Sequence, residues 1–393
     1  MMPRENVLTT AAARLAGIPF ALSRRGTFHP PHKALILQTC CLSQVMLVTP
    51  LLAALSEAFP DARFDWVVAD WARPAIASNP RVSEIISIGE MDIRRRSWRQ
   101  IGQLVLRLRS DHYDTAFIPT QSALVSYIAW QAGIPQRVGL NIQGKGFAHT
   151  IPVTPPANIE DKGTRALLLA EAVGVPWHIS GKMNMEYAPA DEERTVVTQR
   201  LIGEVGWLGD VPLVIMHPGG GVNPRRSNPD VRWPEGRFVV LGNHLMQAHK
   251  AKIVLVGTAE EKELAADIAG MMAGRVINYA GRMSLGEMAA MCEVADLFVG
   301  NDTGTSQIAA ATGCRTLVIY GPTNPAYSRP YSTRGNVFTL WRELDDLAAE
   351  RPFSWKNGIT AEEAMAKADE VLGQPADRGR TMAILSGKGR EKD

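Results

Sequence analysis

Short aliphatic runs alternate with longer amphipathic stretches along most of the chain. The apolar runs of the first half lie at 34–37, 63–68, 84–88, 115–118 and 137–140, with a helical pattern at 44–58. Those of the second half lie at 213–216, 253–256, 297–299 and 316–320, between helical patterns at 235–249, 260–272, 284–294 and 304–312. Runs that are apolar on both faces are typical of central parallel strands. Their alternation with helices predicts an α/β protein with two doubly wound parallel sheets.

Prolines and glycines between Gly174 and Asp191 interrupt this periodicity and indicate a domain boundary. Two sheets of this kind that face each other would leave a cleft at the carboxyl ends of their strands, where a donor could meet an acceptor. We predict five segments: a basic segment at 1–33, an N-terminal domain at 34–188, a C-terminal domain at 189–345, a helical segment at 346–372 and a disordered tail at 373–393.

Composition narrows the class of protein. The 393 residues include 46% hydrophobic and 21% charged positions, as expected of a soluble globular protein. The net charge of +2 is too small to indicate nucleic-acid binding. The four cysteines, of which Cys40 and Cys41 are adjacent, show neither metal-ligand spacing nor a disulfide framework. With no apolar run of about 18 residues or signal-peptide pattern, we expect a cytoplasmic protein.

Two basic segments allow two interpretations each. Residues 1–33 mix apolar side chains with arginines and contain one acid, Glu5, so they fit either contact with an anionic membrane surface or a poorly ordered tail. The helical pattern at 94–109 carries six arginines, and Asp92 is the nearest acid. It fits either a solvated helix face or binding to an acidic acceptor or to membrane phosphates.

A glycine-rich loop follows the strand predicted at 213–216. Neither half contains the G-x-G-x-x-G fingerprint, which weakens the case for a NAD- or FAD-dependent enzyme. Gly219 and Gly220 would let a ligand approach the backbone, and Arg225 and Arg226 add charge suited to a phosphate. Taken alone, a glycine-rich loop after a strand is more often a simple turn than a binding loop.

A second loop, Gly300-Asn301-Asp302-Thr303-Gly304, joins a buried strand to a helix. Free backbone N–H groups at the positive end of a helix make an anion site, which suits a pyrophosphate. The plain alternative is that Asp302 or Thr303 caps the helix, and capping and binding are compatible.

Read in order, these motifs resemble glycosyltransferase family 9, the ADP-heptose:lipopolysaccharide heptosyltransferases. The resemblance covers roughly residues 33–335. Its motifs are Leu35-Ile36-Leu37, 45–50, 59–66, His217-Pro218-Gly219, Arg232-Trp233-Pro234, 254–257 with Glu260, Arg282-Met283-Ser284-Leu285, 299–304 and 321–325.

The resemblance implies a GT-B fold of two Rossmann-like domains and an inverting reaction without cofactor or metal. The donor, ADP-heptose or another nucleotide sugar, would bind the C-terminal domain, and a saccharide-lipid acceptor would lie beside the N-terminal domain at the cytoplasmic face of the inner membrane. By position, Met283 would meet the adenine through its backbone, Glu260 the ribose hydroxyls and Asp302 the sugar. The N–H groups of Thr303 and Gly304 would take the pyrophosphate.

Three positions depart from the family pattern. Gln44 stands where the family has its general base, an aspartate, and an amide cannot take a proton from an attacking hydroxyl. Val231 replaces the lysine before Arg-Trp-Pro, and Gln307 replaces a histidine. Asp70, at the end of the second predicted strand, is a candidate alternative base, although it also fits a helix cap before Ala72.

These departures leave three hypotheses open. The first is an inverting heptosyltransferase-type enzyme with a weakened or relocated catalytic apparatus. The second is a catalytically degenerate nucleotide-sugar-binding pseudoenzyme in envelope-polysaccharide assembly. The third is an epimerase-like enzyme of the same architecture, which would isomerise a nucleotide sugar without an acceptor.

Overall fold

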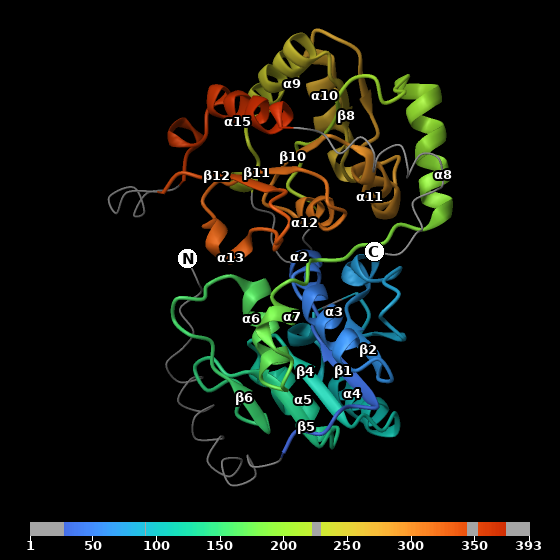
Figure 1. Ribbon diagram of the computed structural model, residues 1–393, viewed down its shortest axis with the longest axis vertical. Coiled ribbons are helices and arrows are strands. Elements are labelled where there is room, and N and C mark those ends of the chain that lie inside the picture. Colours follow the sequence, from blue (N-terminus) through green and yellow to red (C-terminus); the bar gives the residue numbers. More distant parts are fainter. Residues whose placement is uncertain (1–26, 91, 222–228, 344–352, 375–393) are drawn as a thin grey trace. The chain divides into compact units, whose positions relative to one another are not determined.

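The computed structural model describes residues 27–90, 92–221, 229–343 and 353–374. The chain divides into two compact units, Met1–Met185 and Glu186–Asp393 (Figure 1). Several predictions fall outside the described residues: those for most of the basic N-terminal segment, for Arg225 and Arg226, and for most of the predicted tail.

The N-terminal unit contains a six-stranded parallel sheet in the order β3-β2-β1-β4-β5-β6. Its strands are β1 (Lys33–Leu37), β2 (Arg63–Val68), β3 (Glu84–Ser87), β4 (Thr115–Ile118), β5 (Gln136–Leu140) and β6 (Ile151–Val153). Its helices are α2 (Leu42–Met46), α3 (Thr49–Ala58), η1 (Asp70–Ala75), η2 (Ile93–Arg95), α4 (Trp98–Ser110), α5 (Ala123–Gln131), α6 (Lys162–Glu171) and α7 (Trp177–Ser180).

The single helix predicted at 44–58 is wrong in one respect, because the structure has two helices there. α2 ends at Met46 and α3 begins at Thr49, with Pro50 in its first turn. A proline fits the first turn of a helix but disrupts a helix interior. The break therefore follows from Pro50.

The C-terminal unit repeats the architecture, with a six-stranded parallel sheet in the order β12-β11-β10-β7-β8-β9. Its strands are β7 (Leu213–His217), β8 (Lys252–Leu255), β9 (Val276–Asn278), β10 (Leu297–Asn301), β11 (Thr316–Ile319) and β12 (Val337–Leu340). Its helices are α8 (Asp191–Arg200), η3 (Leu201–Val205), η4 (Pro229–Val231), α9 (Glu235–His249), η5 (Ala259–Glu261), α10 (Lys262–Met271), α11 (Leu285–Val294), α12 (Gly304–Ala311), α13 (Pro325–Ser328), η6 (Trp355–Asn357) and α15 (Ala361–Gly373).

The last helix, α15, packs against α9 (Figure 1). Ala364, Ala368 and Val371 of α15 are fully buried in the same hydrophobic cluster as Leu241 and Leu245 of α9. The helix α15 is therefore part of the core of the C-terminal unit, whereas residues 346–352 of the predicted helical segment lie outside the described residues.

Each sheet has one place where successive strands are added in opposite directions. In the N-terminal sheet this switch lies between β1 and β4, and in the C-terminal sheet it lies between β7 and β10. The loops that leave two such strands diverge to opposite faces, which opens a crevice at the carboxyl edge of the sheet. Each unit therefore has one topologically favoured ligand site.

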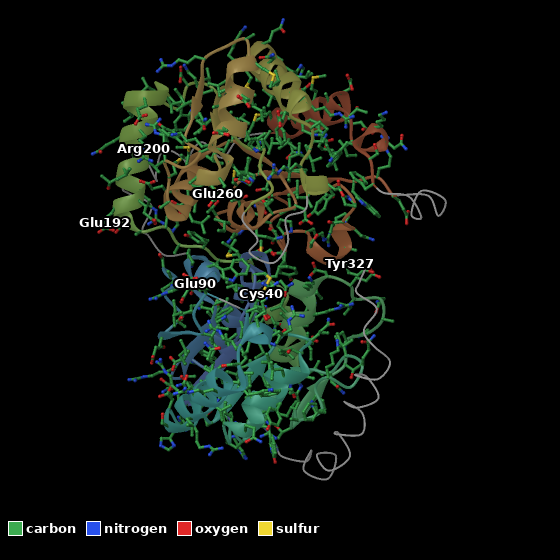
Figure 2. The ribbon with its side chains drawn as sticks, turned by 180° about the vertical axis from the view of Figure 1, so that it is seen from behind. Cys40, Glu90, Glu192, Arg200, Glu260 and Tyr327 are labelled. Atoms are coloured by element: carbon green, nitrogen blue, oxygen red, sulfur yellow. A yellow bond between two sulfur atoms is a disulfide. The ribbon has the colours of Figure 1, made fainter. Side chains whose placement is uncertain are left out.

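The described helices include none that is long and apolar enough to cross a membrane. The expectation of no disulfide is wrong for the adjacent pair, because Cys40 and Cys41 are joined to each other (Figure 2). Cys292 and Cys314 are buried and free.

Candidate nucleotide-sugar site

Asn301 links the two loops that line the crevice between β7 and β10. Its side chain is fully buried. The Nδ2 atom donates to the carbonyl oxygens of Pro218, at 3.0 Å, and Gly219, at 2.9 Å. The Oδ1 atom accepts from the backbone N–H of Trp233 at 3.0 Å. One amide thus fixes the glycine-rich loop and the Arg-Trp-Pro segment against the end of β10.

The glycine-rich loop needs glycine at Gly219 and Gly221 for different reasons. A Cβ on Gly219 would lie 1.9 Å from Glu261 Oε1, so a side chain there would displace a buried carboxylate. Gly221 has a φ of +68°, a conformation that L side chains rarely adopt. These constraints keep the loop close to Glu261.

Beneath this loop, His217 and Glu261 form a buried pair. His217 Nε2 lies 3.1 Å from Glu261 Oε2, and the other ring nitrogen, Nδ1, lies 2.9 Å from Thr305 Oγ1. Both ring nitrogens thus have a partner, the Glu261 carboxylate at Nε2 and the Thr305 hydroxyl at Nδ1. The histidine therefore joins η5 to the start of α12 through the end of β7.

Glu261 also accepts two backbone hydrogen bonds, from Gly221 N–H at 2.8 Å and from Thr258 N–H at 2.9 Å. Burial acts to raise the pKa of this carboxyl. The hydrogen bonds from His217, Thr258 and Gly221 outweigh burial and lower the pKa to about 2. Glu261 is therefore ionised at neutral pH and holds the glycine-rich loop in place.

The resemblance identified Glu260, and not Glu261, as a site residue. The two neighbours differ: Glu260 is exposed, whereas Glu261 is 5% exposed. Glu260 is thus free to meet solvent or a ligand beside the carboxyl end of β8. The signal for Glu261 was present in the sequence as Thr258-x-x-Glu261, a capping-box pattern.

The loop Asp302-Thr303-Gly304 leads directly into α12. Thr303 occupies the N-cap position but makes no side-chain cap hydrogen bond; its hydroxyl lies 2.7 Å from Thr305 Oγ1. Asp302 Oδ2 accepts from Ser328 Oγ of α13 at 3.1 Å. Neither residue therefore acts as the simple side-chain cap that the sequence allowed.

Gln307 and Val231, two positions that depart from the family resemblance, lie near Ser328 and near Gly220 respectively. Gln307, 1% exposed, donates from Nε2 to the carbonyl of Ser328 at 2.7 Å. Gln307 and Asp302 thus both contact Ser328, a residue that sequence reasoning missed. Val231 is the last residue of η4, immediately before Arg232.

Arg232 is exposed and reaches the glycine-rich loop. A Cβ on Gly220 would lie 3.3 Å from Arg232 Nε. A guanidinium beside this loop supplies the kind of charge that a lysine at position 231 would bring. Met283, partly buried, comes just before α11, at the end of the β9–α11 connection.

In the N-terminal unit, Gln44 lies on α2, which follows β1 at the switch point. Its Oε1 atom accepts from Gln38 Nε2 at 3.5 Å, and its backbone N–H donates to Cys41 O at 2.8 Å. Asp70 begins η1, which packs against α2. Its carboxylate accepts a hydrogen bond from Ser87 Oγ and makes no side-chain cap for η1. Asp70 remains exposed, on an element in contact with the one that carries Gln44.

The arginine-rich segment is less free of counter-charge than the sequence suggests. Arg107 pairs with Glu84 at 2.6 Å and with Asp111 at 3.8 Å, and Arg94 pairs with Asp92 at 3.4 Å. Among the described residues, Arg95 and Arg99 have no acidic partner.

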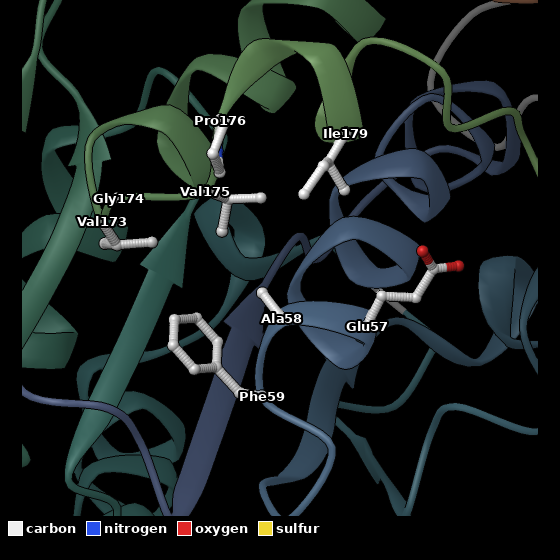
Figure 3. A pocket seen from close by; sticks show the side chains of 8 residues that line it. All are labelled: Glu57, Ala58, Phe59, Val173, Gly174, Val175, Pro176 and Ile179. Carbon is white, nitrogen blue, oxygen red and sulfur yellow. The ribbon is translucent and has the colours of Figure 1, made fainter.

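A separate hollow of about 320 Å³ lies in the N-terminal unit (Figure 3). It is lined by Glu57, Ala58, Phe59, Val173, Gly174, Val175, Pro176 and Ile179. Since α3 runs back from the end of β1 toward the start of β2, its last turn lies at the amino edge of the sheet. The hollow is thus remote from the switch point of its own sheet.

Two parallel-sheet units with these switch-point crevices define a protein of the GT-B fold. Residues 101–353 match the model of glycosyltransferase family 9 (heptosyltransferase), and the chain belongs to that family. It is 23% identical over 317 residues to lipopolysaccharide heptosyltransferase 2 of Escherichia coli K12, a match that covers 78% of this chain and 88% of that protein.

Two solved structures support the fold. A glycosyl transferase family 9 protein from Veillonella parvula superposes with a TM-score of 0.73 at 20% identity, covering 88% of this chain and 98% of that one. The E. coli heptosyltransferase WaaC, solved with ADP-2-deoxy-2-fluoro heptose, superposes with a TM-score of 0.62 at 19% identity, covering 86% and 99%. The predicted GT-B fold and the family resemblance are confirmed.

Proposed function

We propose that this protein is an inverting glycosyltransferase of heptosyltransferase type. It transfers a sugar from ADP-heptose or a similar nucleotide sugar to a lipopolysaccharide-core or related cell-envelope saccharide. The observation that carries the proposal is the β7–β10 crevice, where Asn301 holds a glycine-rich loop beside the first residues of α12. Family membership and the ADP-sugar analogue bound to WaaC support the choice of donor.

The donor would bind this crevice through groups of three kinds. The N–H groups of Thr303 and Gly304, at the positive end of α12, take the pyrophosphate. Glu260 accepts the ribose hydroxyls, and the backbone of Met283 meets the adenine. Asp302 contacts the sugar, with its carboxylate oriented by Ser328.

Charge on the departing diphosphate would be offset by arginine. Arg232 lies beside Gly220 and is the described candidate to replace the cation lost at Val231. Arg225 and Arg226, which lie outside the described residues, remain predicted contributors. Gly219 and Gly220 allow the phosphates to approach the loop backbone.

Acceptor activation is the altered part of the site. Gln44 cannot act as a base, so it would orient the acceptor hydroxyl through its amide. Asp70 is the proposed substitute base, since it is exposed and lies on an element that packs against α2. Loss of the original base typically costs about 10²- to 10⁴-fold in rate, so we expect slow transfer.

The test is a transfer assay on purified wild-type protein beside Gln44→Asp. We expect the variant to transfer sugar faster by roughly 10²-fold or more, because a carboxylate replaces an amide at the acceptor. Gln44→Asn is the matched control, which should not gain activity. Equal rates for the aspartate and asparagine variants would contradict the assigned role of Gln44.

The second candidate is a nucleotide-sugar-binding pseudoenzyme, favoured by the substitutions at Gln44, Val231 and Gln307. It predicts donor binding with neither transfer nor hydrolysis. Donor turnover that disappears in Asp302→Ala would exclude it. An epimerase of the same architecture would instead release an isomerised nucleotide sugar in the absence of any acceptor.

We further propose that the protein works at the cytoplasmic face of the inner membrane, where a saccharide-lipid acceptor would be found. The supporting feature is the exposed surface of α4. Trp98 is 75% exposed and Leu106 63% exposed, and Arg99 of α4 and Arg95 of the preceding η2 have no acidic partner in the part of the chain that the structure describes. Apolar and cationic side chains together suit an anionic lipid surface.

A further inference from the structure

A cluster of two histidines and one aspartate lies on the C-terminal unit, outside the crevice described above. His244 and His249 belong to α9, and Asp369 belongs to α15. His244 Nε2 lies 2.9 Å from both carboxylate oxygens of Asp369, and His249 Nε2 lies 2.7 Å from Oδ1. Three potential ligand atoms from two helices thus converge on one point.

The backbone that carries these side chains is well anchored. α15 begins with a capping box between Thr360 and Glu363, and the preceding carbonyl, of Ile359, accepts from Trp233 Nε1 at 2.8 Å and from Arg237 Nη1 at 2.6 Å. The apolar face of α15 is buried against α9. The three side chains are therefore brought together by packing and do not depend on their own contacts to meet.

The chemistry of these three side chains favours one class of metal ion. Two imidazole nitrogens and one carboxylate oxygen suit Zn²⁺, Ni²⁺ or Co²⁺, whereas Ca²⁺ and Mg²⁺ prefer oxygen ligands alone. The side chains are 29%, 25% and 42% exposed, which leaves room for water to complete the coordination. Metal bonds of about 2.0–2.2 Å need ligand atoms roughly 3 Å apart or slightly more, so the contacts of His244 and His249 with Asp369 have to lengthen by a few tenths of an ångström.

The position of the cluster indicates its role. α9 starts near the carboxyl end of β7 and ends at His249, just before β8 begins, so His249 lies at the amino edge of the sheet. The β7–β10 crevice opens at the other edge. An ion at the cluster would therefore join α15 to α9 without contacting the donor.

We propose that His244, His249 and Asp369 form a structural binding site for a divalent transition-metal ion of the zinc class, which clamps the C-terminal helix α15 onto α9. The metal is not a reactant and takes no part in sugar transfer.

The test uses the untagged full chain, stripped with EDTA and titrated with Zn²⁺ by calorimetry, with the melting temperature followed in parallel. We expect one saturable site per chain and a higher melting temperature with Zn²⁺. Both effects should be lost in His244→Ala/His249→Ala and in Asp369→Asn. His178→Ala, which removes an exposed histidine of the N-terminal unit, should keep them.

Substitution with Co²⁺ gives a second readout, because imidazole and carboxylate coordination produces visible absorption bands that neither an ion pair nor a helix contact produces. These bands should appear in the wild type and in His178→Ala and be absent from the cluster variants. No saturable Zn²⁺ binding, or binding and spectra that are unchanged in the cluster variants, would overturn the proposal.

Discussion

Two adjacent acids, Glu260 and Glu261, show how much of the site is decided at the level of single residues. The family pattern points to Glu260, whereas the structure gives the buried hydrogen-bonding position to Glu261. In the short helix η5, successive side chains point in different directions, so one is exposed and the other lies beneath the glycine-rich loop. We infer that Glu260 contacts the ligand, whereas Glu261 holds the glycine-rich loop in place.

Glu261→Gln should destabilise the protein in a pH-dependent way. The folded pKa of about 2 lies below the ordinary value of 4.5, so the carboxylate stabilises the fold above about pH 4.5 and loses this effect as pH falls toward 2. The difference of about 2.5 units corresponds to at most about 3 kcal/mol. Denaturant unfolding of wild type and variant between pH 3 and 7 measures it.

Glu260→Gln is the matched neighbour for this experiment. Because Glu260 is exposed, the free energy of unfolding of the Glu260→Gln variant should stay within about 0.5 kcal/mol of the wild-type value. Its donor affinity should fall, since a ribose contact is weakened. If the free energies of unfolding of the wild type and Glu261→Gln differed by the same amount at every pH, the charge of Glu261 would not be what stabilises the fold.

At the scale of elements, α4 carries the proposed membrane contact. Vesicles that contain anionic lipid should bind the full chain, and binding should weaken as salt is added. Arg95→Ala/Arg99→Ala should reduce binding, because each cation near an anionic surface contributes about 1 kcal/mol. Co-sedimentation with anionic and with neutral vesicles checks this.

Arg107→Ala is the control for the α4 experiment. Arg107 is also exposed on the helix, but its charge is already paired with Glu84 and Asp111. The Arg107→Ala variant should therefore lose less vesicle binding than the Arg95→Ala/Arg99→Ala variant. Equal binding by the wild type and by Arg95→Ala/Arg99→Ala would show that α4 is not the lipid-binding surface.

Hydrophobic patterning predicts the central elements well and the edge elements poorly. β2 and β4 occupy the predicted residues, because both are buried apolar runs. β6, β9 and β12 were missed, since they are edge strands of three or four residues that stay partly exposed. A strand that pairs on one side and is half exposed leaves little apolar signal.

Of the candidate site, the sequence predicted the backbone loops and not the side-chain contacts between distant residues. The loops at 217–221 and 300–304 follow from strand-to-helix changes, which patterning detects. The buried pair of His217 and Glu261, 44 positions apart, depends on which strands become neighbours. The same holds for Asn301, which binds carbonyls more than 80 positions away. Nothing local in the sequence specifies these partners.

At the scale of the whole molecule, the two units share one plan, but the altered chemistry is divided between them. Asn301 and Glu261 hold the glycine-rich loop of the β7–β10 crevice in place, and Arg232 lies beside Gly220 of this loop. In the N-terminal unit, the family resemblance puts Gln44 where the family has an aspartate, and we propose that acceptor activation is the altered step. Donor binding should therefore be retained even if transfer is slow.

Calorimetry of the purified full chain with ADP, ADP-heptose and other nucleotide sugars tests whether the β7–β10 crevice binds a nucleotide sugar. We expect saturable binding that weakens about tenfold in Arg232→Ala, the cost of one charge-assisted contact to phosphate. Arg275→Ala, an exposed arginine just before β9 at the amino edge, should bind like the wild type. If the protein bound none of these nucleotide sugars, the β7–β10 crevice would not be a donor site.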